Sequence, residues 1–373
     1  MTLRIRVLRT LEECSPIQDD WARLVRMEGG GILGFDVTAT SVWTAAIWRG
    51  MLGGSPQTVL VAEDDSGVRG LLPCSISPEN IGNVPHYKLT AIGSIYELRT
   101  GFLVGGDAAV LDALLEYALK KLKGWDTFIF RVVDGSPSDL AIREVMRKRN
   151  IQVEVWKDWV SPYFHLPSDP ALVLSSLKSK LRSNVRRLDK TLQQLGKLEA
   201  RFYDTADSVP GFIDLMDVIE QRSWKLAAGT AMTTNPKQKM LYSVVTPAVA
   251  RIGCFLGAAL MLNDQPIAYI YGYAFAGVFV DEKESYDDQY KEHGPGNVLK
   301  AKFLEELVRR GIGTYDYGGV AEPHKAQWTN LTYSRHIYII YNNTVRGWLV
   351  RSSLRVRKWV AGLRRPQSSS LMT

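Results

Sequence analysis

Three short apolar runs follow one another in the second half of the chain, and they limit its possible folds more than any other feature. They span residues 254–262, 266–275 and 278–286, and the segments between them, Asn263-Asp264-Gln265 and Ala276-Gly277, have the composition of tight turns. Runs of this length joined by such turns predict a three-stranded antiparallel meander.

A glycine-containing turn and a helical pattern follow the meander. His293-Gly294-Pro295-Gly296-Asn297 precedes apolar residues at helical spacing, Gly311 is expected to end the helix, and Thr314–Tyr317 is predicted as a short strand. Glycines allow a ligand to approach the backbone, and the first N–H groups of a helix lack acceptors within it. The turn is therefore a candidate site for the diphosphate of a nucleotide-like donor. On these residues alone, a plain turn with a helix cap is the alternative.

This order of elements resembles the GNAT superfamily of acyltransferases. The likeness is closest to its FemAB-like and BioF2-like branch, often described as a cellulose-biosynthesis-type acetyltransferase domain. His324 stands where that branch most often has a tyrosine before a lysine. The resemblance is clear from about Lys178 to Trp328 and weak over residues 1–150. The matching segments are Tyr286-Asp287-Asp288-Gln289-Tyr290, Gly294-Pro295-Gly296, Tyr315-Asp316-Tyr317-Gly318-Gly319, and Glu322-Pro323-His324-Lys325 with Trp328.

The resemblance implies a mixed α/β (α+β) fold with two tandem GNAT-like halves, each a mostly antiparallel twisted sheet flanked by helices. The patterns agree, because helices, a meander, a helix and a strand occur twice along the 373 residues. We expect an N-terminal half over residues 1–168, a basic connecting helix over 169–197, a catalytic half over 198–343 and a basic amphipathic tail over 344–373.

Some expectations concern single elements. Periodicity predicts one helix over Val209–Trp224, two separate strands over Gln152–Trp156 and Tyr163–Leu166, and a closing strand over Tyr333–Tyr341.

Charge is unevenly distributed. The net charge is +7, and the segment Thr344–Thr373 alone has seven basic residues and no acidic ones, so the rest of the chain is neutral. A second basic block, residues 178–197, has seven Lys or Arg against the single Asp189. Two basic segments on a neutral body favour anionic partners.

The cysteines and the apolar content bear on the cellular compartment. Cys14, Cys74 and Cys254 show no C-x-x-C spacing, which argues against a disulfide framework and favours a reducing environment. The N-terminus has no apolar core of signal-peptide length, and no stretch approaches the length of a membrane-spanning helix. We expect a cytoplasmic protein.

The resemblance implies direct attack of an amine on an acyl carbon, so the amine must lose a proton and fixed donors must stabilise the oxyanion. The candidate catalytic residues are Asp316, Tyr317, Asp281 and Glu284. Strand alternation places Asp281 on one face and Glu282 and Glu284 on the other. A solvated strand end, and an Asp316 that only accepts loop amides, are the structural alternatives.

Binding residues are proposed in two groups. The donor is expected to contact His293, Gly294, Gly296 and Asn297, and the acceptor to contact Arg222, Trp224, Tyr286, Asp287, Lys325 and Arg186. Arg186 belongs to the basic pattern Lys180-x-Arg182-x-Asn184-x-Arg186-Arg187 of the branch, for which a solvated interdomain helix is the alternative. The five histidines show no ligand spacing, so we expect no metal. The sequence has no Walker loop and no Rossmann fingerprint, and we expect no permanently bound cofactor, with acyl-CoA as a donor substrate.

The leading hypothesis is an N-acyltransferase that uses acyl-CoA and an amine of a small, sugar-linked or lipid-linked acceptor, in polysaccharide or cell-envelope biosynthesis. A Fem-type reaction with aminoacyl-tRNA is the close alternative, because basic segments suit tRNA phosphates. Against it, the chain has no stretch as long as the coiled-coil arm common in Fem proteins that read tRNA. The third hypothesis is a non-enzymatic protein that binds anions or membrane surfaces.

The tail supports a membrane hypothesis of its own. From Val345 to Leu363, basic residues such as Arg351, Arg355 and Lys358 border an apolar helix face, the composition of a helix that lies in a membrane interface. The alternative is a helix packed on the body of the protein. The residues of the predicted face are Val345, Trp348, Leu349, Ser352, Val356, Trp359, Val360 and Leu363.

Overall fold

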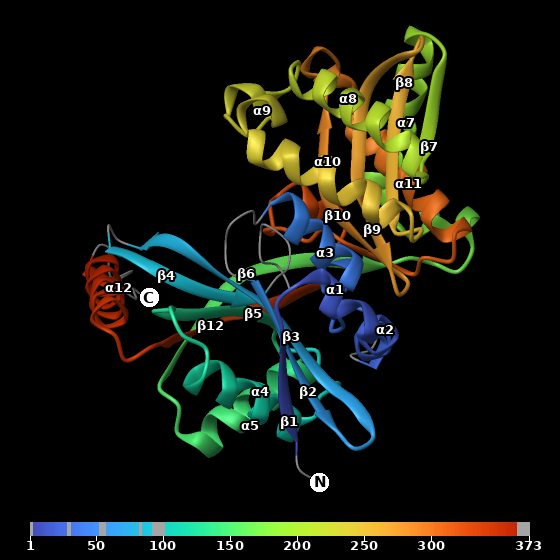
Figure 1. Cartoon of the computed structure of the whole chain (residues 1–373). Coiled ribbons are helices and arrows are strands. Elements are labelled where there is room, and N and C mark those ends of the chain that lie inside the picture. Colours follow the sequence, from blue (N-terminus) through green and yellow to red (C-terminus); the bar gives the residue numbers. More distant parts are fainter. Residues whose placement is uncertain (1–2, 28–30, 52–56, 82–83, 92–100, 364–373) are drawn as a thin grey trace.

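The computed structural model describes residues 3–27, 31–51, 57–81, 84–91 and 101–363, with side chains described up to residue 355. Two lobes lie side by side, and one twelve-stranded sheet runs through both (Figure 1). Its strands are β1 (Arg4–Leu8), β2 (Gln57–Asp64), β3 (Gly67–Ile81), β4 (Val84–Ala91), β5 (Thr127–Val133), β6 (Val153–His165), β7 (Leu198–Tyr203), β8 (Phe255–Leu262), β9 (Gln265–Phe275), β10 (Val278–Tyr286), β11 (Thr314–Asp316) and β12 (Thr332–Tyr341).

Helices cover both faces of this sheet. They are α1 (Leu11–Cys14), α2 (Gln18–Met27), α3 (Ser41–Gly50), α4 (Ala108–Lys120), α5 (Pro137–Arg149), α6 (Val173–Ser176), α7 (Ser179–Leu195), α8 (Val209–Glu220), α9 (Trp224–Ala227), α10 (Pro236–Ala250), α11 (Pro295–Arg309) and α12 (Val345–Leu363). Short 3-10 helices lie at Ser15–Ile17, Val37–Ala39, Pro170–Leu172, Ala206–Ser208, Met232–Thr234, Asp288–His293 and Lys325–Gln327.

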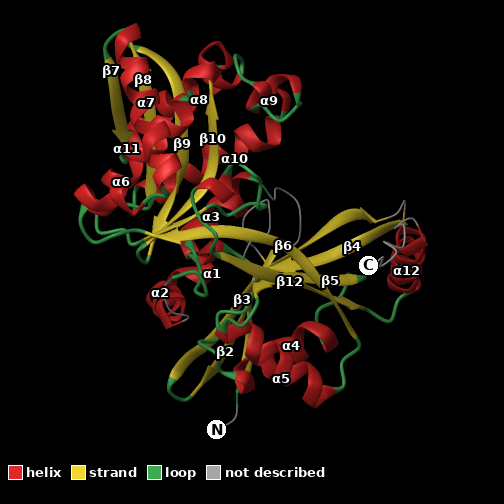
Figure 2. Ribbon diagram, turned by 180° about the vertical axis from the view of Figure 1, so that it is seen from behind, coloured by secondary structure: helices red, strands yellow, loops and turns green. Residues whose placement is uncertain are grey.

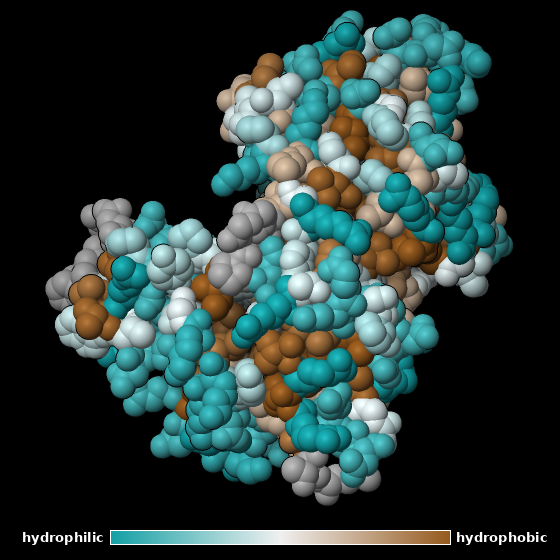
Figure 3. Space-filling model, viewed as in Figure 1, coloured by the Kyte–Doolittle hydropathy of each residue, from teal (hydrophilic) through white to brown (hydrophobic). Residues whose placement is uncertain are grey.

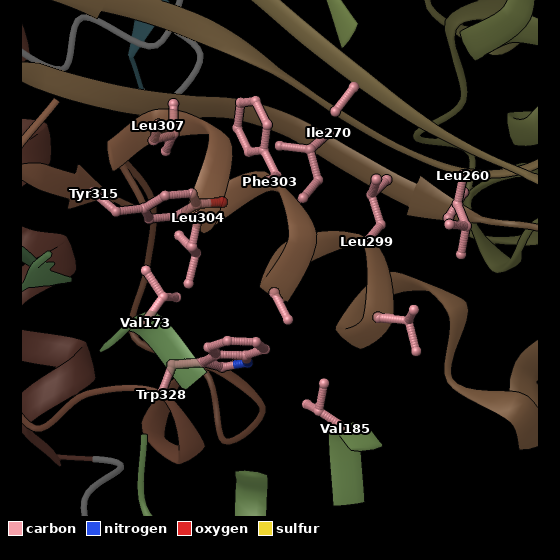
Figure 4. Packing of buried hydrophobic residues seen from close by; sticks show 14 of the residues in the cluster. Val173, Val185, Leu260, Ile270, Leu299, Phe303, Leu304, Leu307, Tyr315 and Trp328 are labelled. Carbon is pink, nitrogen blue, oxygen red and sulfur yellow. The ribbon is translucent and has the colours of Figure 1, made fainter. Parts of the chain in front are cut away.

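Each lobe has a core on either side of its sheet. In the first lobe α4 and α5 pack on one face and α1 and α2 on the other; in the second lobe α7 and α11 pack on one face and α8 and α10 on the other. Figure 4 shows the α11 core, where Phe303 lies beside Ile270 of β9 and Leu299 and Leu307 lie on either side of Phe303 along the helix. The helix α3 joins the lobes, because a Cβ atom on Gly50 would lie 2.4 Å from Val244 of α10.

The two lobes share one sequence of elements. Each has a meander, a helix, and then a strand that pairs in parallel with the last meander strand: β4 with β5, and β10 with β11. The other pairs are antiparallel, so the expected tandem, mostly antiparallel fold is confirmed.

The lobes exchange their final strands. The strand β6 leaves the first lobe and pairs with β11 of the second, while β12 returns and inserts between β5 and β6. Figures 1 and 2 show β6 passing from one lobe towards the other. The strand β12 therefore lies in the first-lobe part of the sheet, although its residues fall within the range 198–343 that we expected for the second half.

Several element boundaries differ from those predicted. The two strands expected at Gln152–Trp156 and Tyr163–Leu166 are one strand, β6, because its first part pairs with β12 and its last residues pair with β11. The helix expected over Val209–Trp224 ends at Glu220, because the Ser223 side chain accepts the Lys225 N–H and starts α9. The connecting segment divides into α6 and α7 rather than forming one helix.

The tail helix α12 packs on the first-lobe part of the sheet, and the face that it buries is not the predicted one. Gly347, Val350 and Leu354 are buried there, and a Cβ atom on Gly347 would lie 2.9 Å from the Asp126 carbonyl oxygen. The predicted apolar residues Val345 and Trp348 stay exposed. The remainder of the predicted face, from Val356 onwards, lies outside the described side chains.

Candidate active site

The candidate site lies where two parallel strands separate. The strands β10 and β11 pair over three residues only, Val278–Val280 with Thr314–Asp316, and β10 then continues to Tyr286 without β11 beside it. Backbone groups and side chains on this edge of β10 are thus available to a ligand that enters between the strands.

A β-bulge begins at the point of separation. The pairing of β10 with β9 shifts register between Asp281 and Lys283, so Glu282 is the extra residue. Because the bulge breaks the alternation of side chains, Asp281 and Glu284 share the face covered by α11, whereas Glu282 and Lys283 face α8 and α10. The prediction that Asp281 and Glu284 lie on opposite faces is wrong for this reason.

A buried lysine organises the α11 side of the site. The Nζ atom of Lys300 lies 2.7 Å from a carboxylate oxygen of Glu284 and 4.3 Å from the centre of the Tyr317 ring. The rings of Tyr315 and Trp328 lie 5.5 and 5.7 Å from the same ammonium group. An ion pair and three aromatic faces therefore stabilise this charge, which the sequence analysis did not single out.

The two carboxylates of the site differ in proton affinity. Burial, and then the charge of Glu284, raise the pKa of Asp281 to about 7, while the Tyr315 hydroxyl donates a 2.6 Å hydrogen bond to its Oδ2 atom. Burial opposes ionisation of Glu284, but the Lys300 ammonium outweighs burial and holds the Glu284 pKa below its ordinary value. At neutral pH Asp281 is thus the carboxylate poised to accept a proton.

Tyr317 brings a hydrogen-bond donor to the same face. Its hydroxyl is buried and has no hydrogen-bond partner among the described residues. Burial, and then the charge of Glu284, raise its pKa well above the ordinary value, so the hydroxyl keeps its proton. An orphaned buried donor of this kind costs free energy unless a ligand supplies the acceptor.

Asp316 lies on the opposite face of β11. Its carboxylate is fully buried and accepts hydrogen bonds from the Gly318 N–H at 2.8 Å and from the Tyr333 hydroxyl at 2.9 Å. These contacts correspond to the structural alternative considered for Asp316, and they separate it from Asp281 and Tyr317.

Comparison with known proteins agrees with this geometry. Residues 179–326, which hold the meander, the bulge and α11, match the family model described as an acetyltransferase (GNAT) domain. The chain carries a GNAT-type acyltransferase domain. Among curated proteins, none matches the sequence significantly.

Solved structures show that the fold of the whole chain is shared with tandem and Fem-like proteins. The crystal structure of FemX has a TM-score of 0.63 and 12% identity, and the match covers 92% of this chain and 100% of that one. The tandem GNAT protein from the clavulanic acid biosynthesis pathway has a TM-score of 0.50 and 12% identity, covering 90% and 98% of the two chains. The C-terminal domain of a putative lysylphosphatidylglycerol synthetase from Agrobacterium fabrum has a TM-score of 0.50 and 10% identity, covering 93% and 96%.

The glycine turn opens α11 of the GNAT domain, as predicted. Gly294 is the N-cap with φ +51°, and a Cβ atom there would lie 2.7 Å from Leu188 of α7, so only glycine fits without a shift. Pro295 has no N–H, and the N–H groups of Asn297 and Val298 both donate to the Gly294 carbonyl. Within the described chain this leaves the Gly296 N–H free at the helix start, enough for one oxygen of a donor phosphate.

The acceptor candidates of the GNAT domain gather at the far end of β10. Arg222 Nη1 lies 3.8 Å from the Asp287 carboxylate, and Trp224, two residues after Arg222 in the chain, is half exposed. Tyr286 lies next to the glycine turn, since a Cβ atom on Gly296 would be 3.6 Å from its ring. The remaining candidates, Lys325 and Arg186, lie apart from this group.

Lys325 and Arg186 sit on elements that flank α11. Lys325 Nζ lies 3.2 Å from Glu322 and 5.5 Å from the Tyr317 ring, which places it beside the Asp281 cluster. The Nε2 atom of His324 lies 3.9 Å from a carboxylate oxygen of Glu284. Arg186 is exposed on α7, whose buried side packs on α11.

A second buried cluster lies behind the bulge and was also missed. The carboxylate of Glu220 accepts the Tyr269 hydroxyl and lies 3.1 Å from Lys283 Nζ and 3.6 Å from Lys225 Nζ. Burial, and then the charge of Lys283, lower the Lys225 pKa to about 8. The sequence signal was the spacing of Glu220 and Lys225 around the Ser223 cap, and this spacing alone does not distinguish a buried ion pair from a surface one.

Potential metal ligands come together at one place in the described part of the chain, in the first lobe. Asp134, Asp139 and His336 have ligand atoms within 4.8 Å of one another. The guanidinium of Arg143 lies 2.7 Å from Asp134 and 2.8 Å from Asp139, so a cationic side chain already occupies the group. Absence of a metal stays a prediction.

Proposed function

We propose that the chain is an N-acyltransferase that moves an acyl group from acyl-CoA to an amine, with Asp281 as the general base. The observation that carries the proposal is that two groups lie on one face where β10 and β11 separate. One is Asp281, whose pKa is raised to about 7, and the other is the buried Tyr317 hydroxyl, which has no hydrogen-bond partner among the described residues. The Oδ1 atom of Asp281 makes no hydrogen bond within the described residues and is available to the amine.

The chemistry follows from these two groups. The amine nitrogen attacks the acyl carbon, the carbon–sulfur bond breaks, and the ammonium proton passes to Asp281. The Tyr317 hydroxyl donates a hydrogen bond to the leaving thiolate and so stabilises the negative charge that develops on its sulfur in this buried site. Lys300 positions Glu284 and Tyr317 and does not itself transfer a proton.

The pH dependence of the reaction tests the role of the base. Because Asp281 acts only when ionised, kcat/KM should rise with pH and level off above about 7, the pKa of this carboxyl group. Thioester consumption with acetyl-CoA and a panel of amines, followed from pH 5.5 to 9 (a span of about four units around the expected pKa), gives the profile. A profile that is flat across this range would contradict the assignment.

Donor binding at the glycine turn gives a second test. Gly296→Val should raise the dissociation constant of coenzyme A by about 10-fold or more, because side-chain methyls would cover the one free N–H of the turn. Gly211→Val is the matched control, since a Cβ atom at Gly211 meets nothing within 4 Å. Calorimetric titration of both variants decides the point, and unchanged affinity in Gly296→Val would remove the donor from this turn.

An aminoacyl-tRNA donor is the second candidate. It is favoured by the basic residues Lys180, Arg186, Arg187 and Lys190, which are exposed on α7 away from α11. Phosphate contacts of this kind make binding strongly dependent on salt. A double change, Arg186→Glu with Arg187→Glu, would then weaken tRNA binding while leaving coenzyme A binding unchanged.

The acceptor is proposed to be an amine on a small molecule, a sugar or a lipid-linked precursor in polysaccharide or cell-envelope synthesis. The half-exposed Trp224 and the Arg222–Asp287 pair at the end of β10 support an acceptor with both apolar and charged parts. We place the reaction in the cytoplasm, with a lipid-linked acceptor bringing the enzyme to the inner membrane face. None of the described helices is both long and apolar enough to cross a bilayer.

A further inference from the structure

The helix α12 leaves an apolar face uncovered even though it is docked. Its buried side, with Val350 and Leu354, lies on the first-lobe part of the sheet. On its other side, Val345, Trp348 and Leu349 are 78%, 66% and 41% exposed. These three residues are spaced i, i+3 and i+4, so they form one stripe along the outer side of the helix. Figure 3 shows apolar atoms at the surface over α12.

Basic side chains border this stripe. Arg346 is exposed beside it, with its guanidinium 5.6 Å from the centre of the Tyr87 ring, and Tyr87 is itself 43% exposed. Arg351 and Arg355 lie about one and two helical turns after Trp348. Both approach the same carboxylate, Glu154, at 4.0 and 3.7 Å. One acid facing two arginines leaves an excess of positive charge beside the stripe.

The sign of this charge selects among possible occupants of the stripe. From Thr344 to Thr373 the chain has seven basic and no acidic residues, so a second copy docked through this helix would bring like charges together. A bilayer with anionic headgroups is complementary, because it offers negative charge around an apolar layer at the depth of Trp and Leu side chains.

We propose that the outer face of α12, formed by Val345, Trp348 and Leu349 with Arg346, Arg351 and Arg355, is a docking surface for anionic membranes. The helix lies parallel to the bilayer with Trp348 in the interface, and its inner side stays packed on the first-lobe part of the sheet. Docking of this kind does not depend on the identity of the acyl donor, so a test of membrane docking is independent of a test of the proposed reaction.

Vesicle sedimentation with the full chain tests the proposal. The protein should pellet with vesicles of mixed phosphatidylcholine and phosphatidylglycerol at low salt, and should stay in the supernatant with pure phosphatidylcholine. Trp348→Glu should lower the partition coefficient by about 10-fold or more, because it removes an interfacial aromatic ring and adds a repelled charge. Arg346→Glu should act in the same direction and should also reduce the dependence on salt.

Matched controls keep the result interpretable. Leu140→Glu places the same charge at a residue of α5 that is 59% exposed, and it should leave vesicle binding unchanged. Val345→Glu, at the most exposed position of the stripe, repeats the test if Trp348→Glu lowers the thermal midpoint. Absence of pelleting by the unchanged protein, or pelleting unaffected by both stripe variants, would overturn the proposal. Dimers that Trp348→Glu dissociates would overturn it too, by assigning the face to a second copy.

Discussion

Asp281→Asn should lower kcat by about 10²- to 10⁴-fold, the usual contribution of a general base. The change removes the proton acceptor but keeps the volume of the side chain and an oxygen for the 2.6 Å hydrogen bond from Tyr315. Single-turnover measurement, with the enzyme in excess over acyl-CoA and the amine saturating, separates this loss from donor binding, which should be unchanged.

As pH rises, the free energy of unfolding of Asp281→Asn should increase relative to that of the unchanged protein. Because the folded-state pKa of Asp281 is raised, protonation of this carboxylate stabilises the fold. This stabilisation is fully present below the unfolded pKa of 3.8 and is lost as pH rises through about 7. Asparagine has no such loss. The Asp281→Asn protein should therefore gain in free energy of unfolding, relative to the unchanged protein, between pH 5 and pH 8 (each about one to two units from the folded pKa).

Glu282→Gln is the matched control for both effects. Burial, and then the charge of Asp36, raise the Glu282 pKa to about 7 as well, but the bulge turns this side chain away from Lys300 and the α11 face. It should share the pH-dependent gain in stability and keep full turnover. If Glu282→Gln lost as much turnover as Asp281→Asn, the loss would reflect buried charge in general and the assignment of the base would fail.

Lys300→Met should destabilise the fold by about 2 kcal/mol or more, because it leaves Glu284 and three aromatic faces without their cation. The Lys300 side chain is 4% exposed and that of Glu284 is 29% exposed, so water replaces part of the lost interaction. The variant should also move the rising limb of the pH profile upwards, since the Lys300 charge favours ionised Asp281. Urea unfolding and the pH dependence of kcat/KM measure the two effects.

A double variant and a neighbour complete this test. Adding Glu284→Gln to Lys300→Met should recover much of the lost stability, because no unpaired charge then remains in the cluster. Lys302→Met breaks an ion pair with Asp189 whose lysine is 35% exposed, and it should cost at most about 1 kcal/mol. Equal losses in Lys300→Met and Lys302→Met would show that Lys300 has no special place in the site.

Local signals in the sequence were sufficient for much of the fold. The meander, α11 and its glycine turn were predicted because strand periodicity, tight-turn residues and helix spacing are all local properties. Lys300 also left a local signal that was overlooked: it lies three, four and seven residues before Phe303, Leu304 and Leu307, on the apolar stripe of α11. A lysine on such a stripe indicates a buried partner, here Glu284.

Other features depend on pairing between distant residues. Alternation predicts the side of a strand on which Asp281 and Glu284 lie only if the ladder is unbroken, and the bulge at Glu282 arises from the register with β9. The hydrogen bond from Tyr333 to Asp316 requires β12 and β11 to lie on the two sides of β6, which no periodicity reveals. Sequence reasoning therefore named Asp281, Glu284 and Tyr317 as candidates, but it missed Lys300 and did not reveal which of these residues share a face.

The exchanged strands have a consequence for synthesis of the chain. While a ribosome is still translating the second lobe, β5 and β6 are complete but the strand that belongs between them, Thr332–Tyr341, has not been made. Until β12 is made, the facing edges of β5 and β6 lack their partner strand, a condition that favours mispairing with other chains. We expect synthesis of this protein to depend on chaperones that shield β5 and β6 until the last strand emerges.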